Sequence, residues 1–372
     1  MRFPEFSGEW EKYTIGDLCE EFKSGKNIKA ESIQEEGVYP VFGGNGLRGY
    51  TDRYNHDGDY VLIGRQGALC GNVRFVTGKT YITEHAIAAK ATNDNYTRYL
   101  EYLFVRLNLG QFSDQSAQPG LAVNKLLKIE TYVPSKAEQL KIAFLLRLLD
   151  ERIATQNKII EKLESLIKGL NDSLYVRYGD DIRTSFAELG YSYSGLSGKS
   201  AGDFGTGKPF ITYLNVYSNN VVNENDYQYV QIDEGEKQNV VQYGDVLFTL
   251  SSETPEEVGI GSVYLGQDEV YLNSFCFGVH IVNEELAYPP YISYYVSSTP
   301  FRKFIYPFAQ GSTRFNLCKA DFEKASITLP SLDNQKRIHS VLNSITMKIN
   351  TERAMLEQYV TQKQHLLRQM FI

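Results

Sequence analysis

The sequence lacks most of the patterns that mark disulfide-rich, metal-binding and membrane proteins. Its 372 residues include four cysteines, Cys19, Cys70, Cys276 and Cys318, and no two of them form a Cys-x-x-Cys pair. This distribution disfavours a disulfide framework and a zinc site, and it is typical of a protein of the reducing cytoplasm. No run of about 18 apolar residues occurs, so we expect no membrane-spanning helix. The first residues also lack the apolar core of a signal peptide.

Catalytic and cofactor motifs are missing as well. The five histidines show no metal-ligand spacing, and neither a nucleophile elbow nor a paired-acid signature occurs. The stretch from Gly202 to Lys208 resembles a phosphate-binding loop, but Pro209 replaces the hydroxyl residue that such a loop needs for Mg²⁺, and a strand pattern follows. Tyr288-Pro289-Pro290-Tyr291 resembles the loop of amino-methyltransferases, but Tyr288 cannot replace the Asn or Asp that holds the amine. We therefore expect no catalytic residue, no metal and no cofactor in this chain.

An excess of basic residues, the usual sign of a nucleic-acid binder, is also lacking. Lys and Arg number 38 against 45 Asp and Glu, for a net charge of −7, and most of the acidic excess lies in residues 179–332. We expect the few cations of that segment to converge on one surface, with the acidic residues on the opposite side.

An internal repeat dominates what the sequence does contain. At an offset of 196 residues, Pro134, Gln139 and Ile142 match Pro330, Gln335 and Ile338. After each Pro an apolar series with alternating steps of four and three begins, and its sum of seven is the period of a supercoiled helix pair. We expect two long helices that pack on each other as a coiled coil through Ile142, Leu146, Leu149, Ile153, Ile160, Leu163, Ile167, Leu170 and Leu174 of the first helix and Ile338, Leu342, Ile345, Ile349, Leu356, Tyr359, Leu366 and Met370 of the second.

A globular segment precedes each predicted helix. Gly58–Ile63 and Gly244–Phe248 are each a turn signal followed by an apolar run, which predicts a buried strand in both copies. The early parts differ, because Gly37–Tyr50 has no counterpart around Lys208–Val222. We expect an α+β protein with two similar α/β globes and a pseudo-twofold repeat, divided as globe 1–137, helix 138–178, globe 179–332 and helix 333–372.

Glycine-rich polar loops are the best candidates for a binding surface. They carry Arg and Lys, which read guanine, Asn and Gln, which read adenine, and hydroxyl groups, which hold phosphates. The same loops are also ordinary turns of sheet proteins. The candidate DNA-binding residues are Lys23, Ser24, Lys26, Asn27, Asn45, Arg48, Arg65 and Gln66 in the first globe, and Ser194, Lys199, Ser200, Lys208, Tyr213, Asn215, Ser251, Ser252, Arg302, Lys303, Arg314 and Lys319 in the second.

The whole chain resembles the specificity subunits of type I restriction–modification systems. The resemblance rests on the duplicated order of globe and helix, on Pro134…Glu138-Gln139…Ile142, on the opening Trp10–Leu18, and on Tyr193–Lys199 with Phe210–Val216 in the second globe. Asp333-Asn334-Gln335 departs from the family pattern, which has Glu before Gln.

The resemblance implies that each globe is a target recognition domain that reads one half of a bipartite double-stranded DNA sequence. The helices would form an antiparallel coiled coil, set the spacing and dock two methyltransferase subunits, and restriction–translocase subunits would join the assembly. S-adenosylmethionine, ATP and Mg²⁺ would be used by those partners. Two other hypotheses remain: a non-catalytic adaptor whose globes bind proteins, and a nucleotide-using enzyme built on the loop that ends at Lys208.

Overall fold

The structure, a computed structural model, describes residues 2–113 and 120–371. It forms two compact units: unit 1 comprises Met1–Lys158 and Arg353–Ile372, and unit 2 comprises Ile159–Glu352. Within the described ranges, no helix combines the length and the apolar character that crossing a membrane requires.

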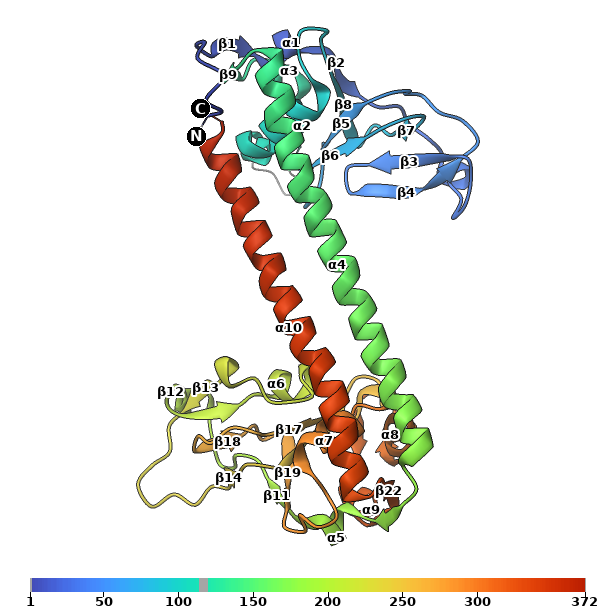
Figure 1. Cartoon of the computed structure of the whole chain (residues 1–372), viewed down its shortest axis with the longest axis vertical. Helices are drawn as coiled ribbons and strands as arrows, with labels where there is room; N and C mark the ends of the chain where they lie inside the picture. Colours follow the sequence, from blue (N-terminus) through green and yellow to red (C-terminus); the bar gives the residue numbers. More distant parts are fainter. Residues whose placement is uncertain (1, 114–119, 372) are drawn as a thin grey trace. The chain divides into compact units, whose positions relative to one another are not determined.

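Unit 1 is built on a four-stranded antiparallel sheet with the order β2-β8-β5-β6 (Figure 1). In β5 (Tyr60–Gly64) every residue is buried. Val61 and Ile63 pack into one core with helix α2, whereas Tyr60 and Leu62 pack into a second core on the other face. Because successive strand residues point to opposite faces, a strand covered on both sides appears as a continuous apolar run. The other strands of this sheet are β2 (Cys19–Ser24), β8 (Ala86–Ala91) and β6 (Val73–Val76).

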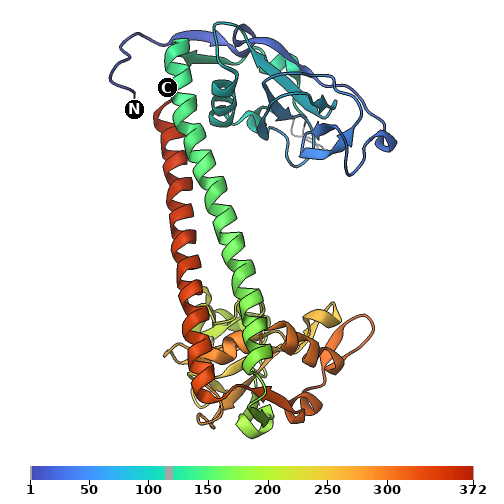
Figure 2. The same cartoon turned by 45° about the vertical axis from the view of Figure 1, so that its right-hand side comes forward.

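The remaining elements of unit 1 form a smaller sheet, a terminal strand pair and short helices. The smaller sheet has the order β4-β3-β7, and its strands β3 and β7 are parallel. Helix α2 contacts both the main sheet and the first half of α4, as Figure 2 shows. The elements are β1 (Glu11–Thr14), which pairs with β9 (Glu130–Val133), α1 (Ile15–Leu18), β3 (Tyr39–Gly43), β4 (Gly46–Thr51), β7 (Tyr81–Ile82), α2 (Thr97–Leu107) and α3 (Val123–Leu126).

Unit 2 repeats this plan. Its main sheet has the order β11-β19-β15-β17, and β15 again alternates between two cores, with Val246 and Phe248 on one side and Leu247 on the other. The strands are β10 (Ile182–Thr184), β11 (Gly190–Ser194), β12 (Phe204–Ile211), β13 (Gln228–Val230), β14 (Val240–Val241), β15 (Val246–Thr249), β16 (Ser251–Ser252), β17 (Gly261–Val263), β18 (Val270–Leu272), β19 (Cys276–Ile281), β20 (Ala309–Gln310), β21 (Phe315–Leu317) and β22 (Ile327–Leu329), and the short helices are α5 (Phe186–Leu189), α6 (Tyr213–Ser218), α7 (Pro289–Tyr295), α8 (Thr299–Ile305) and α9 (Lys319–Lys324).

The expectation that Gly37–Tyr50 has no counterpart around Lys208–Val222 is wrong, because β12 corresponds to β3. In unit 2, β12 pairs in parallel with β18 and antiparallel with β13, just as β3 pairs with β7 and β4 in unit 1. The likeness is hidden in the sequence because helix α6 and a loop separate β12 from β13, whereas β3 and β4 are joined by a tight turn.

The long helices are α4 (Lys136–Tyr178) and α10 (Leu332–Gln369), and each contributes to both units. In unit 1, Leu146 of α4 shares a core with Leu366 and Met370 of α10, and Lys363 forms an ion pair with Asp150.

In unit 2, Ile167 and Leu170 of α4 share a core with Ile338 and Leu342 of α10. Within each unit the two helices therefore run antiparallel (Figures 1 and 2). Every residue predicted for the seam is buried or partly buried. The expected fold class, two α+β domains with long helices packed together, is confirmed.

A buried glutamine explains the repeated Pro…Gln pattern. In unit 1 the amide oxygen of Gln139 accepts a hydrogen bond from the Tyr96 backbone N–H at 3.0 Å, and its nitrogen donates to the Pro134 carbonyl at 3.0 Å. In unit 2, Gln335 accepts from the Tyr288 N–H at 2.8 Å and donates to the Pro330 carbonyl at 2.9 Å. Each glutamine thus joins the start of a long helix to the start of a shorter one, α2 in unit 1 and α7 in unit 2.

The residue before the glutamine is Glu138 in α4 but Asn334 in α10, and the two residues bind different partners. Glu138 accepts two hydrogen bonds from the guanidinium of Arg2, at 2.8 and 2.7 Å, and so fixes the N-terminal segment to α4. Asn334 occupies the equivalent place in α10 and donates to Asp181 at 3.3 Å. Each copy therefore binds the first residues of its own globe.

Candidate nucleic-acid interface

A single turn organises the polar loops of each unit. In unit 1 this turn spans residues 82–86, between β7 and β8, and we call it the tip turn. Its backbone accepts hydrogen bonds from Gly25, Lys26 and Arg65 and donates one to Phe42, at 2.9–3.0 Å. Gly25 has to be glycine, because a Cβ there would lie 2.2 Å from the Ile82 carbonyl oxygen. The ends of β2, β3 and β5 therefore meet at this turn.

Unit 2 contains the same arrangement at residues 272–276, its own tip turn. The backbone N–H groups of Gly195, Leu196 and Leu250 donate to this turn, and Asn273 donates to the Ile211 carbonyl, at 2.7–3.2 Å. A Cβ on Gly195 would lie 2.1 Å from the Asn273 carbonyl oxygen. The tip turn is thus a duplicated backbone frame that brings separate loops together.

In unit 1 the tip turn gathers the predicted residues from three loops. Lys23, Ser24, Lys26 and Asn27 flank Gly25, and Arg65 and Gln66 follow β5. The Gly43–Gly46 turn, which carries Asn45 and leads to Arg48, also approaches the tip turn, because a Cβ on Gly44 would lie 2.7 Å from the His85 carbonyl oxygen. All eight predicted residues are exposed or partly exposed.

In unit 2 the tip turn gathers part of the predicted set. The hydroxyl of Tyr213 donates to the Ser251 carbonyl at 2.8 Å, and Nη2 of Arg314 donates to the Ser251 hydroxyl at 3.1 Å. The Arg314 guanidinium also lies 5.7 Å from the ring centroid of Phe275, in the tip turn itself. Ser194 precedes Gly195 and belongs to the same cluster.

Several predicted residues of unit 2 are internal, and we remove them from the candidate interface. Arg302 donates to the carbonyls of Glu256, Val258 and Gly259 at 2.7–2.8 Å, and its burial lowers its pKa to about 10. Asn215 is fully buried and binds the carbonyls of Asn223 and Asp226.

Lys199 and Ser252 also have internal roles. The Lys199 side chain is only 8% exposed and pairs with Glu236 at 2.5 Å. Ser252 is buried and donates to Glu257 at 3.1 Å. Ser251 is buried too, but its hydroxyl holds Arg314. Burial and the hydrogen-bond or ion-pair partner decide whether each residue belongs to the candidate interface, and neither can be read from the sequence of a loop.

The expected single cationic surface on unit 2 is not formed. Lys208 lies on β12 and pairs with Glu269, Lys303 lies on α8, and Lys319 begins α9 and pairs with Glu323. Ser200 caps a short helical turn through Asp203 and does not contact the tip turn. Acidic neighbours therefore neutralise most of these cations one by one.

Sequence reasoning missed three residues of the clusters. His85 and Phe275 occupy the same place in the two tip turns, and both are about half exposed. Arg74 of β6 lies over the turn at Gly46, where a Cβ would be 3.1 Å from its Nη2 atom. A signal for the turns was present: the Ser-Gly pair of Ser24-Gly25 recurs as Ser194-Gly195 at the end of the equivalent strand.

The described residues offer little support for catalysis. No group of three or more His, Cys, Asp and Glu residues among them could hold a metal ion. Asp245 is a buried carboxylate whose pKa is raised by burial, but its oxygens already accept hydrogen bonds from Tyr193, His280 and the Gln242 backbone. It therefore serves to join strands β11, β15 and β19.

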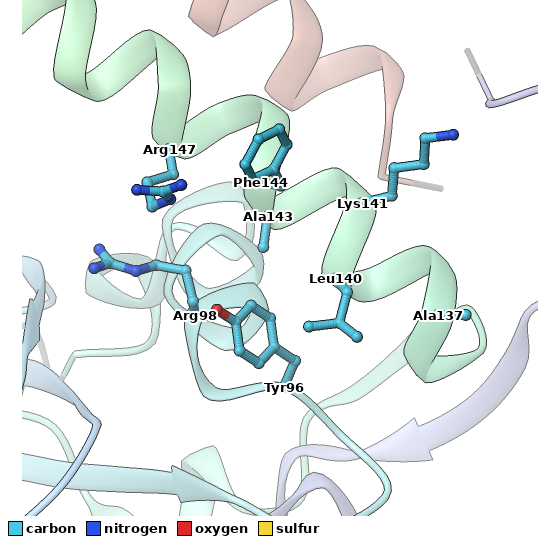
Figure 3. A pocket seen from close by; sticks show the side chains of 8 residues that line it. All are labelled: Tyr96, Arg98, Ala137, Leu140, Lys141, Ala143, Phe144 and Arg147. Carbon is cyan, nitrogen blue, oxygen red and sulfur yellow. The ribbon is translucent and has the colours of Figure 1, made fainter.

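A second feature of unit 1 is an apolar pocket of about 490 Å³ at the start of α4. Leu140 and Phe144 line it and are 43% and 53% exposed. In Figure 3 the side chains of Arg98 and Arg147 lie on one side of the pocket, and Tyr96 lies between Arg98 and Leu140. The α10 residues at the same repeat positions as Leu140 and Phe144 are Lys336 and Ser340, so unit 2 lacks this apolar lining.

Comparison with known proteins agrees with this duplicated architecture. Residues 7–165 and 199–359 match the family model described as type I restriction modification DNA specificity domain. The EcoprrI type I restriction enzyme specificity subunit of Escherichia coli is 40% identical over 154 residues, which cover 40% of this chain but only 38% of that protein. A putative type I restriction enzyme specificity subunit of Haemophilus influenzae is 22% identical over 353 residues, 88% of this chain and 84% of that protein.

Solved structures show the same fold. The crystal structure of the type I restriction–modification S subunit from M. genitalium aligns with a TM-score of 0.65 at 16% identity, over 100% of this chain and 99% of that one. A chain from a structural study of complex assembly in the type I system aligns with a TM-score of 0.59 at 14% identity, over 98% of both chains. Because the family model matches both halves and most of the sequence, this chain belongs to the family of the non-catalytic DNA specificity subunits of type I restriction–modification systems, as its resemblance implied.

Proposed function

We propose that each unit reads one half of a bipartite double-stranded DNA target. The observation that carries this proposal is the duplicated tip turn, which has the same backbone frame in both units but different exposed side chains. One frame with two sets of side chains suits two related sequence-reading tasks. Side chains that read base edges supply specificity, whereas contacts to phosphates supply mainly affinity and position.

The long helices would set the distance between the two half-sites. Helix α4 has 43 residues, which correspond to about 65 Å at 1.5 Å per residue. Inserting seven residues, two helical turns, into α4 keeps the seam periodicity. We expect such a variant either to change the number of unread base pairs or to break the seam, with neither half-sequence altered.

Two methyltransferase subunits would dock on the outer faces of the long helices. Exposed apolar side chains away from the seam support this, since contiguous apolar surface marks binding sites. They are Leu140, Phe144, Leu148, Met355 and Val360 in unit 1, and Ile159, Leu166, Val176, Val341 and Met347 in unit 2.

The pocket of Figure 3 offers a test of this docking. Phe144→Ala should weaken binding of the methyltransferase subunit about tenfold or more, because a buried aromatic anchor contributes strongly to an interface. Ser340→Ala, at the equivalent position of α10, is the matched control. Unchanged binding by the Phe144→Ala variant would exclude the pocket from the interface. Restriction–translocase subunits would complete the assembly, and the partners would use S-adenosylmethionine, ATP and Mg²⁺.

Sequencing of methylated sites in a host that carries the intact system tests the function as a whole. We expect one discrete bipartite motif. Replacing residues 1–137 by the corresponding part of another specificity subunit should change one half of the motif and leave the other half intact. Methylation without a bipartite motif, or a change in both halves, would contradict the proposal.

A protein-binding adaptor is the second candidate, and the neutralised cations of unit 2 favour it. Salt dependence separates the two functions, because every phosphate contact makes DNA affinity fall with ionic strength. Binding of the methyltransferase-bound chain to duplex DNA should weaken steeply with salt. Salt-insensitive binding of a protein, without competition by DNA, would support the adaptor.

A further inference from the structure

Arg314 is an exposed cation of unit 2 whose side chain is held by neutral groups, whereas Arg302, also bound by neutral groups, is directed into the protein by three carbonyls. Lys199, Lys208 and Lys319 each pair with a glutamate. Among the described residues, no carboxylate lies within ion-pair distance of Arg314, which instead donates to the Ser251 hydroxyl and stacks near Phe275. No described residue therefore neutralises the positive charge of Arg314.

These contacts hold the guanidinium in place but involve only part of its N–H groups. A guanidinium has five N–H groups, and only one of them donates to Ser251. The Phe275 ring, 55% exposed, limits the directions in which the planar group can point. A flexible side chain held in this way loses less conformational entropy when it makes two parallel hydrogen bonds.

We propose that Arg314 reads a guanine in the half-site that unit 2 contacts, through bidentate hydrogen bonds to O6 and N7 in the major groove, and that Phe275 is its positioning residue. This inference rests on the DNA-reading function proposed above. A bidentate arginine–guanine pair is the commonest specific contact between proteins and DNA.

The equivalent place in unit 1 supports a reading role. There the tip residue is His85, whose Nδ1 lies 3.4 Å from the amide oxygen of Gln66. Gln66 and Ser251 follow the equivalent strands β5 and β15. At the same position of the tip turn, unit 1 thus has His85 beside the amide of Gln66, and unit 2 has Phe275 beside the guanidinium of Arg314. Two units that read different half-sequences are expected to differ here.

The experiment uses the full chain in complex with its methyltransferase subunits and the target identified by methylation sequencing. Each base pair of both half-sites is replaced in turn, and the Kd of every duplex is measured at one fixed salt concentration. The wild-type complex should discriminate against loss of one G·C pair in the unit 2 half-site by about 10- to 100-fold. The Arg314→Ala complex should lose discrimination at that pair and keep it at all other positions.

Variants of Phe275 test its positioning role. Phe275→Ala should reduce discrimination at the same base pair and should have no further effect when combined with Arg314→Ala. Phe275→Tyr should restore it, because the aromatic face is retained. Arg183→Ala, an exposed arginine on β10, is the matched control and should behave as the wild type.

Three results would overturn the inference. If Arg314→Ala weakens binding to all duplexes equally and lowers the salt dependence, Arg314 contacts a phosphate. If it changes nothing, Arg314 does not contact DNA. If Phe275→Ala and Arg314→Ala act at different base pairs, Phe275 does not position Arg314. Retained discrimination in the unit 1 half-site shows that a variant is folded, and a wild-type complex without a bipartite preference would refute the proposed function itself.

Discussion

Replacing Gln139 by alanine should destabilise unit 1 strongly, although this residue belongs to no catalytic or binding site. Its side chain is 1% exposed and serves the Tyr96 N–H, the Pro134 carbonyl and the Asn95 side-chain oxygen at 2.8–3.0 Å. Alanine leaves two backbone groups without a partner, and each buried orphan group costs about 1–3 kcal/mol. Since water can reach Asn95, its lost hydrogen bond adds little, and we expect a loss of about 2–6 kcal/mol in the free energy of unfolding.

The single tryptophan makes this loss measurable. Trp10 packs against the core of unit 1, so its fluorescence during urea unfolding reports on that unit. The Gln139→Ala transition should move to lower urea, whereas Gln364→Ala, an exposed position on α10, should stay within about 0.5 kcal/mol of the wild type. A loss below about 1 kcal/mol for Gln139→Ala would refute the view that this glutamine holds the two helix starts together.

Three further changes follow from the packing and the ion pairs. Leu146→Ala removes a fully buried seam residue of unit 1 and should cost about 2–5 kcal/mol, whereas Leu148→Ala, at an exposed position of the same unit, should be nearly neutral in the same urea assay. In Arg302→Lys the charge is kept, but a lysine cannot bind three carbonyls at once, so the thermal midpoint should fall. The salt dependence of DNA binding should stay unchanged, and a changed salt dependence would mean that Arg302 contacts DNA. The hydrogen bond from Lys199 lowers the pKa of Glu236 to about 2. The stabilisation of unit 2 by this pair is therefore complete above the unfolded pKa near 4.5 and is lost as the pH falls toward 2. Glu236→Gln should flatten this decline in stability, and an unchanged pH profile would show that the pair does not stabilise unit 2.

The fold was largely predictable because its main signals are periodic. The four-three spacing from Ile142 onward identified the long helices, and the apolar run at Tyr60–Ile63 identified a strand buried on both faces. The structural match between β3 and β12 was not predictable, since it depends on a parallel pairing between distant strands. The segment after β19 forms two short helices, α7 and α8, because Pro300 lies in the first turn of the second.

The candidate site was predictable only where glycine marked it. Glycine-rich loops pointed to Arg48, Arg65 and Gln66, which the tip turn of unit 1 brings together. In contrast, Asn215 and Arg302 have the residue types of DNA ligands, and only their burial and internal hydrogen bonds exclude them. The side chains of the tip turns were missed because these turns are formed by ordinary residues and defined by backbone contacts from elsewhere in the chain.

The tip turn has an evolutionary consequence. Main-chain groups, together with the side chains of Asn55 in unit 1 and Asn273 in unit 2, form the hydrogen bonds of its frame. The identity of the outermost side chain, His85 or Phe275, therefore contributes little to holding the frame together. Mutations at His85 or Phe275 can therefore accumulate with little effect on stability, while each new side chain presents different chemistry to whatever the unit binds. If the two units read DNA as proposed, drift at a few positions can change each half of the recognised sequence independently.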